Sequence, residues 1–250
     1  MGYGRLRYFD KEVRIHQMTS SKEEILNEYY ESVYTKYLFE KSIQSRGIEY
    51  FESLLERKWE PSGTLENVLE VGSGNREHFP YVAYYPSESY VALDIRKNNI
   101  NLEELDLPIE FRRVIKFVQG DVHKLEFEEG HFDRVISTCM FHHLDDPMRA
   151  LAEIRRVTKP SGEISIAMPT DPGIANQVVK KFVSYPRMRK LTNYDPRLIY
   201  ALEHRNHIGG LITLIKHVFE SDSLSLDYYP FKIKSWNLNL AVVARIKKKD

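Results

Sequence analysis

Hydrophobic positions first follow a helical spacing along this chain and later form short buried runs. From Ser20 to about Leu38, apolar side chains recur every four residues, and the stretch opens with the spacing Ser20-x-x-Glu23 of a capping box. A second apolar stripe predicts a helix over Ile48–Trp59. We therefore expect a helical cap over residues 1–60.

After residue 60 the pattern changes to alternating strands and helices. Short apolar runs predict five strands, at 67–71, 90–94, 115–118, 132–137 and 163–168. Before the fifth strand, Asp146 can cap a helix whose first position, Pro147, needs no amide hydrogen. Two more strands are expected near 224–229 and 235–244. Strand–helix alternation implies a mostly parallel sheet covered by helices on both faces.

The pattern thus predicts an α/β fold with a seven-stranded, mostly parallel sheet in a single domain, residues 1–250. Residues 64–169 would form the core that carries the ligand. Residues 170–222 would form a cover over the substrate, with one clear helix at 208–219, and residues 223–250 would add the closing strands.

Composition and charge narrow the classes of function. Lys+Arg and Asp+Glu number 36 each, so the net charge is zero, which argues against general binding to nucleic acid or anionic membrane but leaves room for local patches. The one cysteine, Cys139, excludes an intrachain disulfide and a cysteine-based metal site. The start of the chain lacks the apolar core of a signal peptide, and no apolar run approaches the roughly 20 residues of a membrane span, so a cytoplasmic protein is expected.

The first predicted strand ends in a motif suited to an amino-acid ligand. Ligands of open parallel sheets bind outside the carboxyl ends of the strands. The run Glu70-Val71-Gly72-Ser73-Gly74 places an acid at this end and two glycines in the turn. An acid suits an ammonium group and would repel a pyrophosphate, and Glu77 stands where a dinucleotide motif requires glycine. A plain tight turn is the alternative for this motif taken alone.

The next three strand ends carry further candidates. Asp94 ends the second strand, where a carboxylate can accept both hydroxyls of a ribose. Asp121 and Val122 follow the third, where a carboxylate and a backbone amide can pair with an adenine edge. Ser137-Thr138-Cys139-Met140 ends the fourth with small residues that would admit the methionine part of a ligand, and Cys139 has no neighbour that would activate it as a nucleophile. Solvated or turn carboxylates are the alternatives for both aspartates.

Together these strand ends resemble the class I S-adenosylmethionine-dependent methyltransferases, over roughly Tyr29 to Met168. The glycine motif is LEVGSG, the ribose acid lies in ALD and the adenine motif is GDV. The runs FDRVISTCMFHHLDDP and LAEIRRVTKPSG look like the small-molecule branch that includes the quinone-biosynthesis methyltransferases. The resemblance implies a Rossmann-like fold.

The resemblance also implies that S-adenosyl-L-methionine is the cofactor. The resemblance assigns cofactor contacts to Glu70, Gly72, Gly74, Asp94, Ile95, Asp121, Val122 and Cys139. It also implies that Tyr29 or Tyr30 closes over the ligand. The chain departs from the family at Arg76, where a third small residue is usual, and Pro80 is expected to cut the following helix short.

Methyl transfer is an in-line displacement that needs alignment and, for a hydroxyl acceptor, the removal of a proton. His142 and His143 follow the fourth strand and are the candidate bases, with packing of the next helix as the alternative. In the predicted cover, His204, Arg205 and His207 could bind a phosphate or carboxylate of the substrate. The predicted reaction is methyl transfer to a small molecule, at an oxygen of an anionic metabolite or of a surface-polysaccharide precursor.

Other functions fit the sequence less well. Without a basic surplus nucleic-acid methylation is disfavoured, and Ser137–Met140 differs from the Asn-Pro-Pro-Tyr type of strand end in amino-methylating DNA enzymes. No acidic cluster suggests a catalytic metal. A cofactor-binding module without catalysis and a nicotinamide oxidoreductase remain as alternatives.

Overall fold

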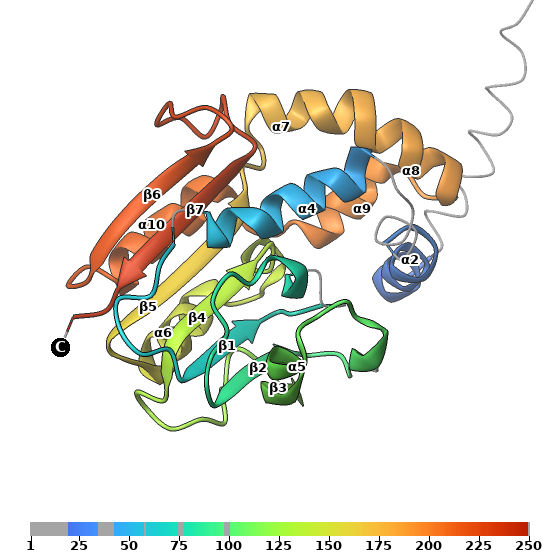
Figure 1. The fold of residues 1–250 in the computed structure, drawn as a ribbon. Helices are drawn as coiled ribbons and strands as arrows, with labels where there is room; N and C mark the ends of the chain where they lie inside the picture. Colours follow the sequence, from blue (N-terminus) through green and yellow to red (C-terminus); the bar gives the residue numbers. More distant parts are fainter. Residues whose placement is uncertain (1–19, 35–42, 58, 75–77, 98–100, 250) are drawn as a thin grey trace, which may run out of the picture. The chain divides into compact units, whose positions relative to one another are not determined.

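The sheet of this protein has seven strands. The computed structural model describes residues 20–34, 43–57, 59–74, 78–97 and 101–249. Its strands are β1 (Asn67–Val71), β2 (Ser89–Asp94), β3 (Ile115–Gln119), β4 (Phe132–Thr138), β5 (Thr158–Pro169), β6 (Ser223–Tyr229) and β7 (Ala241–Lys247). They lie in the order β3-β2-β1-β4-β5-β7-β6 (Figure 1). The first five pair in parallel, and β7 is antiparallel to both its neighbours, which confirms the predicted mostly parallel α/β sheet.

Helices precede the sheet, connect its strands and form a long excursion after β5. The α-helices are α2 (Lys22–Glu28), α4 (Ile43–Glu56), α5 (Ile109–Val114), α6 (Pro147–Val157), α7 (Ile174–Val179), α8 (Tyr185–Leu191), α9 (Pro196–Glu203) and α10 (Ile208–Val218). Shorter turns are the π-helical η1 (Tyr29–Tyr34) and η5 (Lys180–Ser184) and the 3-10 turns η2 (Phe79–Tyr81), η3 (Leu102–Glu104) and η4 (Phe141–His143). Among the described residues, none of these helices combines the length and apolar character that crossing a bilayer requires.

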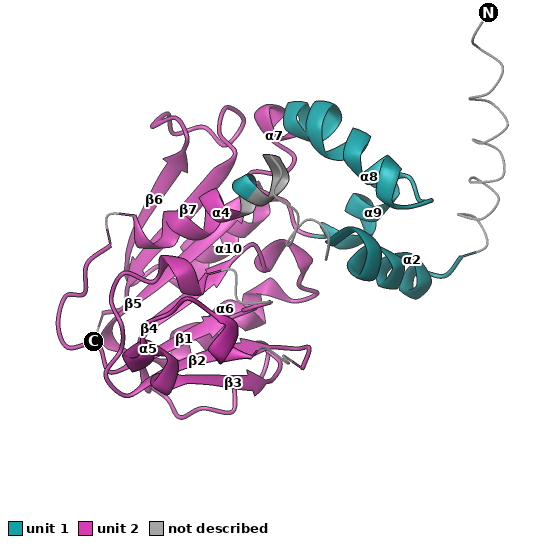
Figure 2. Cartoon of the chain, turned by 45° about the vertical axis from the view of Figure 1, so that its right-hand side comes forward, with its two compact units in different colours: residues 1–47, 177–205 teal, residues 48–176, 206–250 magenta. Residues whose placement is uncertain are grey.

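The chain divides into two compact units (Figure 2). Unit 1 comprises residues 1–47 and 177–205, and unit 2 comprises residues 48–176 and 206–250. Unit 2 contains the whole sheet, whereas the described part of unit 1 is helical. The cap, core, cover and closing segments predicted from the sequence divide the chain at other points, and those boundaries stay predictions.

Two hydrophobic clusters cover the two faces of the sheet in unit 2. Val68 packs in the cluster with Leu54 of α4, while its neighbour Leu69 packs in the cluster with Leu151 of α6 and Leu211 of α10. Successive side chains of a strand point to opposite faces, so β1 is buried on both sides. Burial on both faces is the reason that these strands are continuous apolar runs in the sequence.

The helix starts show how closely local signals locate an element. Asp146 caps α6 as predicted, because its Oδ1 accepts a hydrogen bond from the third backbone amide of the helix. The predicted capping box at Ser20 is wrong by one residue. Ser21 Oγ accepts from the amide of Glu24 at 3.2 Å, and Glu24 Oε2 accepts from the amide of Ser21 at 2.7 Å. The predicted helix end near Leu38 lies outside the described residues.

The last strand begins later than predicted, at Ala241 instead of residue 235. The cause is the fully buried Asn239. Its Nδ2 donates to the carbonyls of Ile233 and Ser235 at 2.9 and 2.8 Å, and its Oδ1 accepts from the amide of Phe231 at 2.8 Å. These hydrogen bonds hold residues 231–238 in a loop, so the apolar alternation in this stretch does not form a strand.

The predicted cover contains more helix than expected, because α7, η5, α8 and α9 precede α10. The α9 helix begins with Asp195, whose Oδ1 accepts from the amide of Arg197 at 2.9 Å, and with Pro196 in the first turn. The same Asp-Pro signal marks α6 and could have identified α9. As predicted from Pro80, the described residues between β1 and β2 form only the 3-10 turn η2, while Arg76 lies outside them.

Candidate functional site

The predicted cofactor residues of four strands meet at one edge of the sheet in unit 2. Because β1 to β4 are parallel, their carboxyl ends lie at the same edge. Asp94 pairs with Gln119 in register, and Glu70 pairs with both Ala92 and Ile136. This edge, which we call the ligand edge, therefore carries the acid and glycines of β1 beside the acid of β2.

The turn after β1 uses the conformational freedom of its two glycines. Gly72 and Gly74 have φ values of +71° and +51°, a region that side chains rarely adopt. The amide of Gly72 donates to the carbonyl of Leu93 at 2.8 Å, which fastens the turn to β2. A Cβ atom on Gly72 would lie 2.8 Å from the side chain of Met140. The turn thus brings bare backbone close to the end of β4.

Asp94 connects the two strand ends and is held in one orientation. Its Oδ2 accepts from the amide of Gly74 at 3.0 Å, and its Oδ1 accepts from the amide of Arg96 at 2.9 Å. Each carboxylate oxygen has two acceptor sites, so both retain capacity for a further donor such as a hydroxyl. The next residue, Ile95, exposes 67% of its surface, and its carbonyl accepts from Gln119 Nε2 at 3.1 Å.

Glu70 is a buried carboxylate, 4% exposed. Its Oε2 accepts from the hydroxyl of Tyr90 at 2.8 Å. Burial, together with the charge of Glu70, raises the pKa of Tyr90 well above its usual value, so this hydroxyl remains a donor. A buried acid of this kind favours a cationic partner, because an uncompensated charge is costly away from water.

Behind the glycine turn lies a buried charge network that the sequence analysis missed. His78 is fully buried, with Nδ1 3.3 Å from Glu52 Oε2 and Nε2 3.0 Å from Glu56 Oε1. Burial alone would lower the pKa of His78, but the neighbouring carboxylates of Glu52 and Glu56 and the charge of Glu70 raise it to about 10. Arg134 Nη1 also donates to Glu56 Oε1, at 2.8 Å. The network fastens α4 to the segment that follows the glycine turn.

The end of β3 has the hydrogen bonding of a turn. Asp121 Oδ1 accepts from the amide and Nδ1 of His123 at 2.9 and 2.7 Å. The backbone hydrogen bond from His123, followed by its ring, holds the pKa of the Asp121 carboxyl below its usual value. Val122 is buried. Both residues lie at the ligand edge, and their contact with adenine stays a prediction.

The end of β4 leaves polar atoms that a ligand could satisfy. Cys139 has a φ of +51° and donates its amide to the carbonyl of Ala167 at 2.9 Å. Within the described part of the chain, the buried hydroxyls of Ser137, Thr138 and Ser73 have no hydrogen-bond partner. Burying a hydroxyl without a partner costs about 1–3 kcal/mol. These hydroxyls, the bare glycine turn and the fixed Asp94 fit a polar ligand at this edge.

Both candidate bases belong to the turn η4, which follows β4. His142 is buried and His143 is partly exposed, with ring centroids 3.9 Å apart. Asn206 Nδ2 donates to the carbonyls of Phe141 and Leu144 at 3.1 and 2.6 Å, and its amide donates to the carbonyl of His142 at 3.2 Å. Asn206, in the sequence run proposed to bind an anion, thus fixes the turn that carries both histidines.

The structure assigns the three predicted substrate residues to different units. His204 and Arg205 belong to unit 1, whereas His207 belongs to unit 2 and precedes α10. Arg205 and His207 are exposed, and the His204 ring lies 4.7 Å from the ring of Tyr200. Their joint binding of a substrate stays a prediction.

The two candidate tyrosines lie in η1 of unit 1. The hydroxyl of Tyr30 donates to Glu203 Oε2 at 2.5 Å. The Tyr29 ring lies 5.2 Å from the Tyr30 ring, and burial, followed by the charge of neighbouring phenols, raises its pKa well above the usual value. The Tyr29 phenol is therefore neutral at physiological pH. The closing of Tyr29 or Tyr30 over the cofactor stays a prediction.

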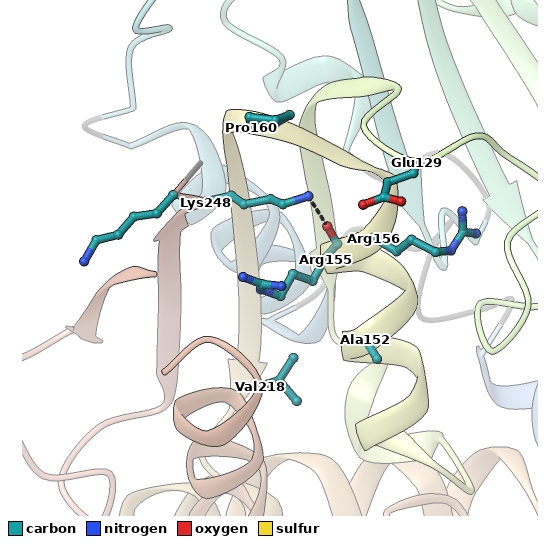
Figure 3. Close-up of a pocket in the computed structure, with 8 residues that line it drawn as sticks. Glu129, Ala152, Arg155, Arg156, Pro160, Val218 and Lys248 are labelled. Atoms are coloured by element: carbon teal, nitrogen blue, oxygen red, sulfur yellow. Dashed lines mark hydrogen bonds between the residues drawn. The ribbon is translucent and has the colours of Figure 1, made fainter. Parts of the chain in front are cut away.

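A separate hollow of about 530 Å³ lies at the opposite edge of the sheet (Figure 3). Pro160 near the start of β5 and Lys248 after the end of the antiparallel β7 both line it. Lys248 Nζ donates to the carbonyls of Arg155 and Thr158 at 2.9 and 2.7 Å, and Arg155 Nε donates to Asp222 at 2.7 Å. These cations serve to join α6, β5 and the C-terminal segment, so the hollow is distinct from the ligand edge.

Part of the chain is similar to known methyltransferases. Residues 69–166 match a family described as a methyltransferase domain. A demethylmenaquinone methyltransferase of Chlamydia caviae is 26% identical over 175 residues, which cover 67% of this chain and 73% of that protein. A demethylmenaquinone methyltransferase of Lactococcus lactis is 34% identical over 79 residues, 32% of this chain and 31% of that protein. The chain thus matches less than a third of the length of the Lactococcus lactis relative.

Among solved structures, a SAM-dependent methyltransferase of Thermotoga maritima has the same fold. Its TM-score is 0.55 at 16% sequence identity, and the match covers 82% of this chain and 90% of that chain. The comparisons confirm the predicted Rossmann-like fold and the resemblance to class I methyltransferases of the quinone type. Residues 69–166 thus resemble a methyltransferase domain, and this match together with the shared fold supports S-adenosylmethionine as the cofactor.

Proposed function

We propose that this protein transfers a methyl group from S-adenosylmethionine to a small-molecule acceptor. The observation that carries the proposal is the ligand edge, where a buried acid, a bare glycine turn and an oriented carboxylate lie together. Three buried hydroxyls at this edge have no hydrogen-bond partner among the residues that the structure describes. The bound cofactor supplies an electrophilic methyl group on a sulfonium. The protein must orient that group, exclude water and, for a hydroxyl acceptor, remove a proton.

Separate residues hold the two ends of the cofactor in this proposal. Buried Glu70 attracts the ammonium, since its carboxylate ends β1 beside the glycine turn and accepts a hydrogen bond from the neutral hydroxyl of Tyr90. Asp94 binds the ribose hydroxyls through the lone pairs that Gly74 and Arg96 leave unused. The remaining assigned contacts, at the ends of β3 and β4, follow the resemblance.

His143 is the proposed base, because it is more exposed than His142 and stands in the turn directly after β4. A neutral imidazole can accept a proton at cytoplasmic pH. Asn206 fixes this turn through two side-chain hydrogen bonds, so the imidazole is attached to a rigid piece of backbone. Such positioning is what general-base catalysis requires.

Two acceptor classes have support. Arg205 is exposed and permanently charged, which favours an anionic metabolite or a surface-polysaccharide precursor. The second candidate is an acceptor of the quinone type, which the names of the Chlamydia caviae and Lactococcus lactis relatives favour.

Isothermal titration calorimetry tests the cofactor part of the proposal. We expect S-adenosylmethionine and its demethylated product to bind, and NAD not to bind. Replacing Asp94 with alanine should weaken binding about tenfold to a hundredfold, the loss for a hydrogen bond to a charged group. Asp106→Ala removes an exposed carboxylate from the loop before α5 and should leave the affinity unchanged. Wild-type affinity in Asp94→Ala would exclude this carboxylate from the site.

Turnover separates an enzyme from a binding module that has lost catalysis. Incubating the protein with cofactor carrying a labelled methyl group, and with panels of phosphorylated metabolites and of quinols, should yield one labelled product class. Cofactor binding without transfer to either panel would contradict the proposed reaction classes.

A further inference from the structure

Four exposed apolar side chains gather beside the end of β6 in unit 2. Phe231, Ile233 and Leu238 of the β6–β7 loop expose 57%, 53% and 49% of their surface, and Ile174 at the start of α7 exposes 64%. The amide of residue 175 donates to the carbonyl of residue 237 at 2.9 Å, so the start of α7 lies against this loop (Figure 1). We call these four residues the apolar rim.

The rim belongs to a built structure, not to a loose loop. Asn239 has no exposed surface and forms three hydrogen bonds to the backbone of residues 231–235. Its own carbonyl accepts from Thr170 Oγ1 at 2.6 Å, which joins the loop to the end of β5. These buried hydrogen bonds hold the loop in a shape that leaves the large apolar side chains of the rim exposed to water. Exposed apolar patches on a protein surface mark sites of association.

The charges around the rim are positive. Lys232 and Lys234 are exposed and alternate with Phe231 and Ile233. No acidic residue occurs in residues 228–240, which form the end of β6 and the β6–β7 loop. Because the entire chain has a net charge of zero, this segment is a local positive excess and favours an anionic partner.

From this combination we propose that the apolar rim and its two lysines bind the surface of an anionic phospholipid bilayer. Apolar side chains that enter the acyl boundary, flanked by cations that meet lipid phosphates, are the pattern of interfacial membrane binding. Nucleic acid would match the lysines alone, since it offers no apolar layer for Ile174, Ile233 and Leu238.

The topology brings this surface to the ligand edge. Since β7 is antiparallel to both β5 and β6, the carboxyl end of β6 lies at the same edge as the carboxyl end of β5. Docking through the rim therefore turns the ligand edge toward the bilayer. The docking itself does not rest on the proposed methyl transfer, so the two can fail separately.

Vesicle flotation of the full chain tests the proposal. We expect the protein to float with vesicles of phosphatidylcholine and phosphatidylglycerol and to bind vesicles of phosphatidylcholine alone more weakly. The pair Lys232→Gln and Lys234→Gln should weaken binding to the mixed vesicles about thirtyfold, since each lysine near such a surface contributes about fivefold. The pair Phe231→Ser and Ile233→Ser should weaken binding to both kinds of vesicle.

Matched control variants remove the same kinds of side chain at other places on the surface. Lys116→Gln with Lys216→Gln removes two exposed lysines of β3 and α10, and Ile109→Ser with Met148→Ser removes two exposed apolar side chains of α5 and α6. Both control pairs should float like the wild type. All altered side chains are exposed, and unchanged thermal melting will show that the variants fold.

Several outcomes would overturn the proposal. Wild-type protein that stays at the bottom of the gradient with mixed vesicles refutes it, as do rim variants that float like the controls. Light scattering that shows a dimer abolished by Phe231→Ser and Ile233→Ser would assign the rim to a second copy of the chain. Retention on single-stranded DNA that requires Lys232 and Lys234, without flotation, would assign it to nucleic acid.

Discussion

His78 should make the folded state of unit 2 depend on pH in a direction that its environment dictates. The imidazole lies between Glu52 and Glu56 of α4, and its pKa is raised from 6.5 in the unfolded chain to about 10 in the folded state. Among the described residues, Glu70 of β1 and Arg134 of β4 also carry charges that face this cluster. The folded protein therefore binds one more proton than the unfolded chain between these two pH values.

The sign and size of the effect follow from proton linkage. Stability from a raised pKa is fully present below about pH 6.5 and is lost as the pH rises toward about 10. A change of one pKa unit corresponds to about 1.4 kcal/mol, so the loss is on the order of 4–5 kcal/mol. Replacing His78 with glutamine should cost about 3–5 kcal/mol near pH 6, because Glu52 loses its cationic neighbour and Glu56 keeps only Arg134.

Urea unfolding of the wild type and of His78→Gln, from about pH 6 to about pH 10, measures this effect. Both tryptophans, Trp59 and Trp236, belong to unit 2, and the guanidinium of Arg134 lies 3.4 Å from the centre of the Trp59 ring, so tryptophan fluorescence reports this region. The difference in unfolding free energy should be largest at low pH and should shrink toward pH 10. His217→Gln, at an exposed site of α10, is the matched control and should follow the wild type. Parallel curves for the wild type and His78→Gln would refute a raised pKa at this residue.

Three further predictions concern catalysis and the glycine turn. His143→Ala should lower kcat about 10²–10⁴-fold and leave the cofactor affinity unchanged. Arg205→Ala should mainly raise KM. An unchanged kcat in His143→Ala would mean that the acceptor reacts without a base. Gly72→Ala should abolish cofactor binding and lower the melting temperature, because its Cβ would meet Met140 at 2.8 Å and its φ is +71°. Gly209→Ala has no atom within 4 Å of the new Cβ and lies in α10, so it should retain both; equal losses in the two alanine variants would contradict this explanation.

The sequence determined the parts of this protein that depend on neighbouring residues. Runs buried on both faces located the strands, and the Asp146-Pro147 signal located α6, because burial and capping act within a few residues. The order of acids and glycines at strand ends predicted the ligand edge, since parallel strands must end together. The resemblance carried by those same motifs was confirmed by the comparisons.

Tertiary structure decided the features that depend on residues distant in the sequence. Glu52 and Glu56 lie four residues apart, so the local sequence places them on one helical face. Their cationic partners, His78 and Arg134, come close to them only in the folded chain. Asn239 likewise converts an alternating apolar stretch into a loop, because its buried amide must satisfy its hydrogen bonds with nearby carbonyls. A local pattern specifies how polar or apolar a position is, but only the assembled structure specifies which buried polar groups satisfy one another.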